Sequence, residues 1–174
     1  MTVARREERG VQGELSASLS RLSRNTLSSI LVIGGTPGER ATIAGALHRD
    51  SRLRAEAFCV TGAGRHEGLL RRSLLGWLGH DAGGAPLDCD RGTLFVDDVC
   101  ALPQDIQRLL FALACRLESS PADARLGPGP ARLAAGSGEE PVAAVAAGRL
   151  LPALHDSLDK VTIHLGHVGA ASAT

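Results

Sequence analysis

Residues 92–99, Gly-Thr-Leu-Phe-Val-Asp-Asp-Val, constrain the fold of this chain more than any other segment. The apolar run, with its aromatic and β-branched side chains, is typical of a central parallel strand that is covered on both faces. Asp97 and Asp98 follow at the carboxyl end of this strand, where open α/β sheets bind their ligands. In a sheet that hydrolyses nucleotides the first acid holds magnesium and the second polarises the attacking water, so Asp97 is a candidate metal ligand and Asp98 a candidate catalytic residue. The alternative is a strand followed by an acidic turn, since Asp is common in turns.

A glycine-rich segment, residues 34–41, lies between a predicted strand at 30–33 and a predicted helix at 42–49. Strand, glycine-rich turn and helix form the geometry of a phosphate-binding loop, in which backbone N–H groups and the helix N-terminus face the phosphate. The candidate cofactor-binding residues are therefore Gly34, Gly35, Thr36, Pro37, Gly38, Glu39, Arg40 and Ala41.

This loop departs at three positions from the phosphate-binding pattern G-x-x-x-x-G-K-[ST]. Gly34 takes the first glycine position, but Glu39 replaces the second glycine and adds negative charge facing the phosphate. Arg40 replaces the lysine and keeps a cation, whereas Ala41 replaces the hydroxyl that would bind magnesium. On the motif alone, an ordinary strand-to-helix turn is the alternative.

Charge and composition limit the classes of partner. The chain has 174 residues, enough for one domain with a buried core, and its 19 Lys and Arg residues balance 19 Asp and Glu residues. Zero net charge argues against broad electrostatic binding to nucleic acid or to an anionic membrane, and no apolar run is long enough for a membrane span. The charged N-terminus has no apolar stretch behind it, so we expect no secretory signal. The four cysteines form no CxxC pair and no zinc pattern, so we expect reduced thiols and a cytoplasmic protein.

The expected fold is an α/β three-layer sandwich of the P-loop NTPase type, with a mainly parallel five-stranded sheet. Leucines at helical spacing from Glu14 onward predict a first helix, and the Pro- and Gly-rich residues 119–130 predict a flexible connection. The strands are expected at 30–33, 57–60, 93–98, 131–135 and 161–165, with helices between them. The expected division of the chain is a flexible N-terminus at 1–13, one domain at 14–168 and a tail at 169–174.

In the order of its elements and motifs, the chain resembles the AAA+ domain of bacterial enhancer-binding proteins, the activators that work with sigma-54 RNA polymerase. The most specific part of the resemblance is residues 92–107, which are similar to the family pattern GTLFLDEI–LP–Q. More weakly similar segments are 31–48 against LI-GESGTGKE-VA-AIH, 58–62 against F–VNC, and 73–85 against ELFGHEKGAFTGA. The resemblance spans about residues 15–168 and implies a degenerate AAA+ domain.

The resemblance also implies roles for single residues. It places residues 34–41 on the Walker A loop and Asp97 on the magnesium aspartate of Walker B. Asp98 stands at the position of the catalytic glutamate and is one methylene shorter. Ser137 stands at the position of the sensor asparagine and is a further candidate for nucleotide binding. The cofactors implied are ATP and Mg²⁺.

Two other regions bear on the partners. Residues 80–85 fall on the GAFTGA loop that contacts the sigma factor, but only Gly84 and Ala85 match, and the aromatic and threonine residues of that contact are missing. Leu151 and Ser157 occupy the positions of arginines that reach the neighbouring subunit's nucleotide. The resemblance implies sigma-54 RNA polymerase or another AAA+ subunit as the partner. We expect no direct DNA binding, because the chain is expected to lack the family's helical lid and helix-turn-helix.

Three functions remain open at this point. The first is an AAA+ ATPase domain that remodels a transcription complex, the second is a non-catalytic pseudo-ATPase that regulates a partner subunit, and the third is a decaying gene with no retained role. Asp97 and Asp98 favour nucleotide or metal binding, whereas the loss of the loop lysine, the hydroxyl and both arginine positions argues against turnover. We therefore predict no detectable ATP hydrolysis and no binding to the sigma factor, and leave the oligomeric state open.

Overall fold

A computed structural model of the chain describes residues 27–64, 66–80, 83–120 and 128–166. Five strands in these ranges form one sheet in the order β2-β3-β4-β1-β5, and every pair of neighbouring strands is parallel. The strands are β1 (Ile30–Ile33), β2 (Phe58–Gly62), β3 (Thr93–Asp97), β4 (Arg132–Ser137) and β5 (Val161–His164). The helices are α2 (Pro37–Arg49), α3 (Glu67–Trp77), α4 (Gln104–Ser119), α5 (Pro141–Ala146) and α6 (Pro152–Leu158), and a 3₁₀ turn, η1 (Val99–Ala101), follows β3.

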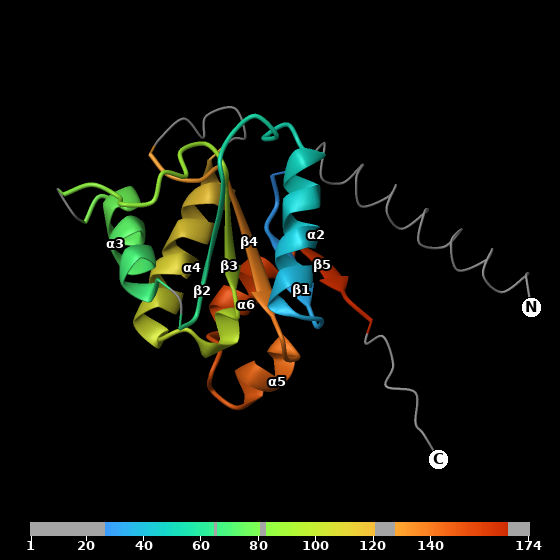
Figure 1. The fold of residues 1–174 in the computed structure, drawn as a ribbon. Helices are drawn as coiled ribbons and strands as arrows, with labels where there is room; N and C mark the ends of the chain where they lie inside the picture. The colour runs from blue at the N-terminus through green and yellow to red at the C-terminus, as the bar shows by residue number, and fades with distance from the viewer. Residues whose placement is uncertain (1–26, 65, 81–82, 121–127, 167–174) are drawn as a thin grey trace, which may run out of the picture.

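Helices cover both faces of the sheet (Figure 1). Helix α2 packs on one face, and α3, α4 and α6 pack on the opposite face over a larger apolar core. Because successive side chains of a strand point to opposite faces, Leu94 and Val96 enter the larger core while Phe95 enters the smaller one. The α/β sandwich predicted from the sequence is therefore confirmed.

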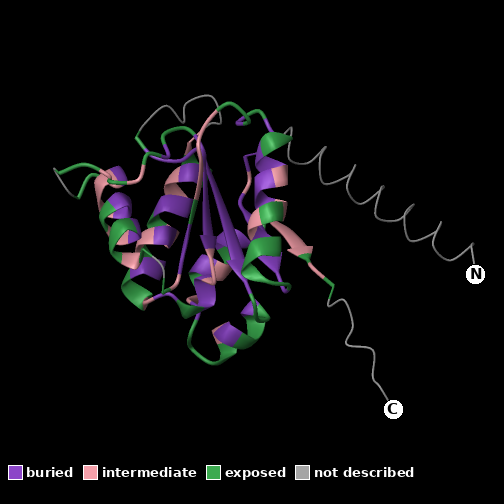
Figure 2. Ribbon diagram, in the orientation of Figure 1, coloured by how far each residue is buried: buried purple, intermediate pink, exposed green. Residues whose placement is uncertain are grey.

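The position of strand β3 in the sheet explains the uninterrupted apolar run at residues 94–96. Leu94, Phe95 and Val96 are each 0% exposed, and the inner strands are drawn as buried in Figure 2. A strand between two neighbours with helices on both faces has no solvent-facing side, so no polar alternation is required.

The strand boundaries differ from the prediction most clearly at β2. The sequence predicted residues 57–60, but β2 continues to Gly62, which pairs with Asp97 in register. A Cβ atom at Gly62 would lie 2.7 Å from the Asp97 carbonyl oxygen, so the close approach of the two strands requires glycine here.

Other expectations concern the helices and connections. Trp77, the last residue of α3, is 3% exposed and belongs to the larger core. The leucine-rich helix predicted from Glu14 and most of the predicted connection, residues 121–127, lie outside the described residues. Within the described ranges, the helices are too short or too polar to cross a bilayer.

Candidate functional site

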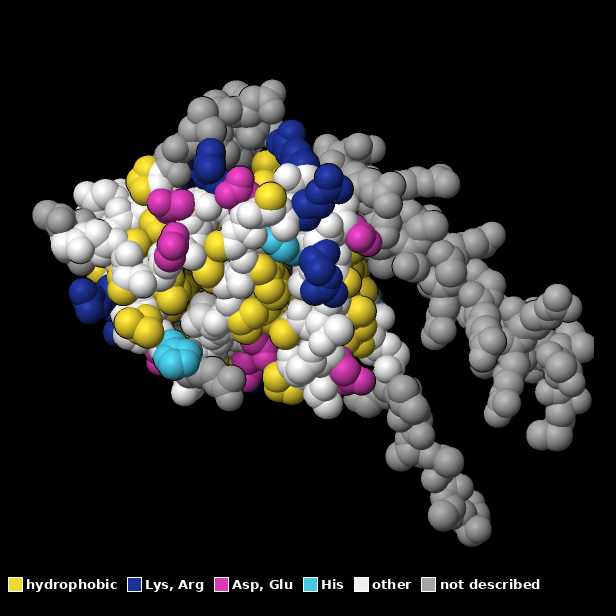
Figure 3. Space-filling view, turned by 45° about the horizontal axis from the view of Figure 1, so that its top comes forward, with side chains coloured by type: hydrophobic (Ala, Val, Ile, Leu, Met, Phe, Trp, Pro, Cys, Tyr) yellow, Lys and Arg dark blue, Asp and Glu magenta, His cyan; other side chains and the backbone are white. Residues whose placement is uncertain are grey.

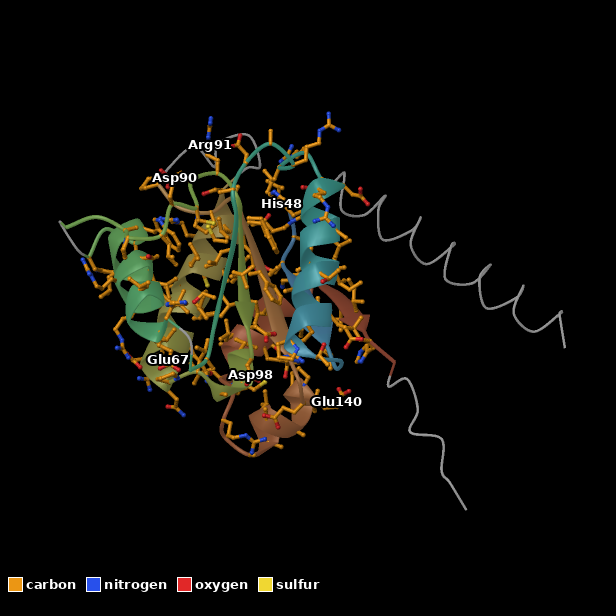
Figure 4. The ribbon with its side chains drawn as sticks, in the orientation of Figure 1. His48, Glu67, Asp90, Arg91, Asp98 and Glu140 are labelled. Carbon is orange, nitrogen blue, oxygen red and sulfur yellow. The ribbon has the colours of Figure 1, made fainter. Side chains whose placement is uncertain are left out.

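The carboxyl ends of β1, β3 and β4 lie side by side, because β4 is hydrogen-bonded to both of the other strands. This arrangement brings together Gly34 after β1, Asp97 at the end of β3, and Ser137 at the end of β4. The Gly34 N–H donates to the Ser137 carbonyl oxygen at 2.9 Å. Asp98, labelled in Figure 4, lies at the same end of the sheet. The residues singled out in the sequence therefore meet at one edge of the sheet.

Arg40, in the first turn of α2, is bound to Asp97 by two hydrogen bonds. Its Nε donates to Asp97 Oδ1 at 2.6 Å and its Nη2 donates to Oδ2 at 2.9 Å, so both carboxylate oxygens are engaged. The Arg40 side chain is 4% exposed and that of Asp97 is 15% exposed. The hydrogen bonds to Asp97 raise the pKa of the Arg40 guanidinium, which keeps its charge. Bidentate pairs of this kind combine charge with fixed geometry.

The glycine-rich loop, residues 34–41, closes over the same guanidinium. Arg40 Nη1 donates to the Gly34 carbonyl oxygen at 3.2 Å and to the Gly35 carbonyl oxygen at 2.9 Å. Both glycines have positive φ values, +83° and +62°, a conformation that other residues rarely adopt. The loop thus turns two carbonyl oxygens toward a cation of its own chain.

Glu39 caps helix α2. The Thr36 N–H donates to Glu39 Oε2 at 2.7 Å, and the Glu39 N–H donates to Thr36 Oγ1 at 3.2 Å, which is a capping box. These hydrogen bonds with Thr36 lower the pKa of the Glu39 carboxyl. The sequence signal for this cap was present, since Thr36 and Glu39 are spaced as T-x-x-E with Pro37 at the start of the helix, but the motif analysis assigned these residues to the phosphate.

Asp98 faces different surroundings from Asp97. It has a φ of +54° and precedes η1, whose Ala101 N–H donates to the Asp98 carbonyl oxygen at 3.0 Å. A cavity of about 360 Å³ opens beside it, between the first turn of α2 and the ends of β2 and β3. Residues lining the cavity include Gly38, Ala41, Thr61, Asp97 and Asp98. Both acids therefore reach one cavity, and Ala41 offers it no hydroxyl.

A second hollow lies on the other side of the loop. Its volume is about 570 Å³, and Thr36, Glu39, Ile43 and Leu165 are among the residues that line it. The residues predicted to bind a cofactor thus separate two hollows at the amino end of α2.

The Ser137 hydroxyl is used within its own turn. It donates to the Glu139 carbonyl oxygen at 2.7 Å and accepts from the Glu139 N–H at 3.2 Å. Cys100 Sγ lies 3.3 Å from Ser137 Oγ, and Ser137 is 0% exposed. It is the backbone of Ser137, through the contact with Gly34, that reaches the loop.

Gln107, the last residue of the segment 92–107 that resembles the family pattern, is a buried polar residue for which no role was predicted. Its Nε2 donates to the Leu102 carbonyl oxygen at 2.8 Å and to that of Arg149 at 2.7 Å, while its Oε1 accepts from the Leu151 N–H at 2.9 Å. Gln107 therefore fixes the segment that carries Leu151 and the buried Ser157, the two positions assigned to arginines by resemblance. A glutamine on the apolar face of a predicted helix was the available signal.

Gly136 is a second residue that was missed. A Cβ atom at this position would lie 2.3 Å from Asp97 Oδ1 and 3.2 Å from Arg40 Cδ. The ion pair therefore occupies space that any side chain at Gly136 would need. The only sequence signal was the run of small residues in β4.

Two remaining expectations concern partners and metals. In the predicted sigma-contact loop, residues 80–85, Asp81 and Ala82 lie outside the described residues. Among the described residues, no three His, Cys, Asp or Glu side chains are grouped as a metal site. On the face drawn in Figure 3, basic and acidic side chains are interspersed over the described surface.

Comparison with known proteins identifies a matching family and several solved structures with a similar fold. The profile of the family described as the sigma-54 interaction domain matches residues 11–164. Comparison with curated proteins gave no match.

The similar solved structures include NtrX from Brucella abortus in complex with ADP, with a TM-score of 0.65 at 17% identity over 87% of this chain and 35% of the NtrX chain. The same protein in complex with ATP has a TM-score of 0.65 at 17% identity over 88% of this chain and 36% of NtrX. The P-loop NTPase domain of the sigma-54 transport activator from E. coli has a TM-score of 0.59 at 19% identity over 89% of this chain and 94% of that domain. The chain therefore spans about a third of NtrX, and these structures share its P-loop NTPase fold.

Proposed function

The chain belongs to the sigma-54 interaction domain family, and from this premise we propose that it is a transcription-regulatory AAA+ domain that does not hydrolyse ATP. The observation that carries the proposal is the bidentate pair between Arg40 and Asp97. The guanidinium, itself almost fully buried, lies against the carboxylate that would hold magnesium in a hydrolysing domain.

The residues around Asp97 do not fit a magnesium ion in this arrangement. Mg²⁺ requires oxygen ligands in near-octahedral geometry at about 2.0–2.1 Å. Arg40 already engages both oxygens of Asp97, and Ala41 supplies no hydroxyl. A metal ion would have to displace a buried guanidinium of the same charge sign, which electrostatic repulsion opposes.

The loop offers few free donors to a phosphate. In a phosphate-binding loop the backbone N–H groups point at the ligand. Here the N–H groups of Thr36 and Glu39 are used in the capping box, and the N–H of Gly34 is used by Ser137. Because these N–H groups already have partners within the chain, they support a loop that does not bind phosphate.

The alternative function is a domain that binds and slowly hydrolyses ATP. One observation favours it: Asp97 and Asp98 line the same cavity as Gly38 of the loop. NtrX, which shares the fold, has been solved with ATP and with ADP. The experiments below distinguish the two functions.

The first experiment measures phosphate release from Mg-ATP by the wild-type chain and by Asp97→Ala. We expect no release above background for either protein, because neither metal nor phosphate has a prepared site. A turnover of about one per second, typical of a slow enzyme, that is abolished by Asp97→Ala would overturn the proposal.

The second experiment restores the loop. The triple variant Glu39→Gly, Arg40→Lys, Ala41→Thr satisfies the phosphate-binding pattern and removes the guanidinium. Because a ligand that binds only the folded state raises its stability, Mg-ATP should raise the Tm of the triple variant and leave that of the wild type unchanged. A rise for the wild type that Arg40→Ala removes would instead support a weak or regulatory ATPase.

The proposed partner is another AAA+ subunit of the same family, rather than the sigma factor. Residues 80–85 lack the aromatic and threonine of the family's contact loop. A pull-down of purified sigma-54 with the tagged chain should recover none. Recovery comparable to that with an intact family activator would contradict this part of the proposal.

A further inference from the structure

Cys59 and Cys89 lie together at the end of the sheet opposite Asp97. Cys59 is in β2, and Cys89 is in the segment that leads into β3. Cys59 Sγ donates to the carbonyl oxygen of Asp88, the residue before Cys89, at 3.2 Å, and Cys59 packs against the core cluster that contains Cys89. Figure 4 places Asp90, the next residue after Cys89, at the far end of the molecule from Asp98.

The two thiols have different surroundings. Cys89 is 0% exposed within the larger core, whereas Cys59 is half-buried on an edge strand of the sheet. The hydrogen bond from Cys89 lowers the pKa of the Cys59 thiol. The same hydrogen bond, together with burial, raises the pKa of the Cys89 thiol. The more accessible sulfur is therefore also the one that ionises more readily.

We propose that Cys59 and Cys89 form a dithiol site that closes to a disulfide when the chain meets a hydroperoxide. The geometry supplies the two requirements of such a site, an accessible cysteine and a buried cysteine in the core cluster against which it packs. Because no three metal-ligating side chains are grouped among the described residues, the pair is suited to thiol oxidation rather than to metal binding.

The reaction balances in two steps. The Cys59 thiol releases its proton, its thiolate attacks one oxygen of the hydroperoxide, and the O–O bond breaks. A sulfenic acid forms, and the leaving alkoxide takes up the released proton to give an alcohol, or water when the oxidant is H₂O₂. The Cys89 sulfur then attacks the sulfenic sulfur, the S–S bond forms, and hydroxide leaves with the Cys89 proton as water. Two thiols are oxidised by two electrons in total, and one peroxide is reduced.

The disulfide would tie the segment that enters β3 to the edge strand β2 and enclose all of α3. Cross-linking restricts the unfolded chain more than the folded one, so the oxidised protein should be the more stable form. Adding a thiol reductant afterwards should cleave the disulfide and return the stability to that of the reduced protein.

The experiment treats the reduced full chain with stoichiometric H₂O₂ and measures intact mass, free thiols and the tryptic peptide map. We expect the loss of two thiols, a mass decrease of two hydrogens and a peptide that joins Cys59 to Cys89. The Tm should rise by at least about 5 °C and return after dithiothreitol.

Cys59→Ser and Cys115→Ser are matched variants, since both cysteines are half-buried but Cys115 lies on α4. Cys59→Ser should keep all its thiols under the same treatment, and Cys115→Ser should still form the bond. In Cys89→Ala, dimedone should trap a sulfenic acid on Cys59. A disulfide that maps to another pair, oxidation that stops at a sulfinic acid in the wild type, or no loss of thiols would overturn the proposal.

Discussion

Arg40 is held by four hydrogen bonds, two to the carboxylate of Asp97 and two to loop carbonyl oxygens. The planar guanidinium fork matches the two oxygens of a carboxylate, whereas a lysine ammonium presents a single point of charge. At this position the arginine is therefore a structural residue that joins the start of α2 to the end of β3. The loop conformation and the ion pair depend on one another, because the same guanidinium binds both.

Removing the carboxylate should destabilise the fold. In Asp97→Ala the Arg40 guanidinium stays buried without its hydrogen-bonded counter-charge, so we expect the free energy of unfolding to fall by about 3 kcal/mol. Urea denaturation measures the change. The double variant Arg40→Met, Asp97→Ala should lose less than the sum of the single variants, because it leaves no unpaired charge.

The exposed pair between Arg71 and Asp105 serves as the control. Their side chains are 42% and 52% exposed, so solvent screens the interaction. Asp105→Ala should leave the denaturation midpoint close to that of the wild type. Equal effects of Asp97→Ala and Asp105→Ala would contradict the buried ion pair.

At the scale of elements, β4 leaves space for the ion pair between its neighbours. Adding a Cβ in Gly136→Ala would place it 2.3 Å from Asp97 Oδ1, a distance that real contacts do not reach. We expect a loss of about 3 kcal/mol or more in the free energy of unfolding, since overpacking a core forces side chains or backbone to move.

Gly138→Ala is the matched substitution two residues further along the chain, just past the end of β4. Its Cβ would lie 3.5 Å from Arg40 Nη1, which is ordinary van der Waals contact. The midpoint of urea unfolding should therefore stay near the wild-type value for Gly138→Ala and fall for Gly136→Ala. A similar midpoint for both variants would show that β4 is free to shift away from Asp97.

The contact between α4 and the segment before α6 depends on Gln107. Gln107→Leu removes three hydrogen bonds and leaves the Leu102 and Arg149 carbonyl oxygens and the Leu151 N–H without that partner. Unsatisfied buried groups carry their full desolvation penalty, so we expect a loss of about 3 kcal/mol. Thermal unfolding followed by circular dichroism measures it.

Gln104 provides the comparison on the same helix. It is exposed and makes one longer hydrogen bond, 3.3 Å from its Nε2 to the Gly148 carbonyl oxygen. Gln104→Ala should therefore change the stability by less than about 0.5 kcal/mol. A loss of stability as large as that of Gln107→Leu would show that burial does not determine how much a glutamine hydrogen bond contributes to stability.

At the scale of the whole molecule, one buried histidine makes the stability depend on pH. His48 Nδ1 lies 2.9 Å from Thr93 Oγ1, and Nε2 lies 3.1 Å from the Glu56 carbonyl oxygen. Burial lowers the pKa of His48 below its ordinary value of 6.5, and the charges of Arg132 and Arg49 add to the effect. The unfolded chain then binds the proton more readily than the folded one.

The contribution of His48 is therefore complete above the unfolded-state pKa of 6.5 and is lost as the pH falls toward the lower folded-state pKa. In that window we expect the stability to fall by up to about 1.4 kcal/mol per pH unit, the limit for one proton. Urea unfolding at a series of pH values tests this. His48→Gln should show a shallower slope, and an unchanged slope would assign the pH dependence to other groups.

The sheet could be predicted from the sequence because its signals are local. Residues 94–96 are apolar without alternation, and β3 is buried on both faces. A turn and a helix after β1 were likewise predicted, but α2 begins at Pro37 rather than at residue 42, because the capping box of Thr36 and Glu39 starts the helix earlier. Parallel strands joined by helical crossovers were predicted as well, whereas the strand order β2-β3-β4-β1-β5 was not.

The contacts that decide the chemistry of the site could not be predicted in this way. The sequence indicated that Arg40 is a cation beside a phosphate-binding loop, but its partner is 57 residues away in the chain. The meeting of Cys59 with Cys89 and the role of Gln107 likewise depend on elements that are joined only by the fold. Spacing rules describe neighbours along the chain and carry no information about such pairs.

The ion pair also affects how a lineage that carries this loop can evolve. Arg40→Lys alone would withdraw the fork from Asp97 and from two carbonyl oxygens. Glu39→Gly alone would remove the cap of α2, and Ala41→Thr alone would add a hydroxyl beside an occupied carboxylate. Each step toward nucleotide binding is thus neutral or harmful by itself. A change from the present loop to the phosphate-binding pattern would therefore require several substitutions to arise together.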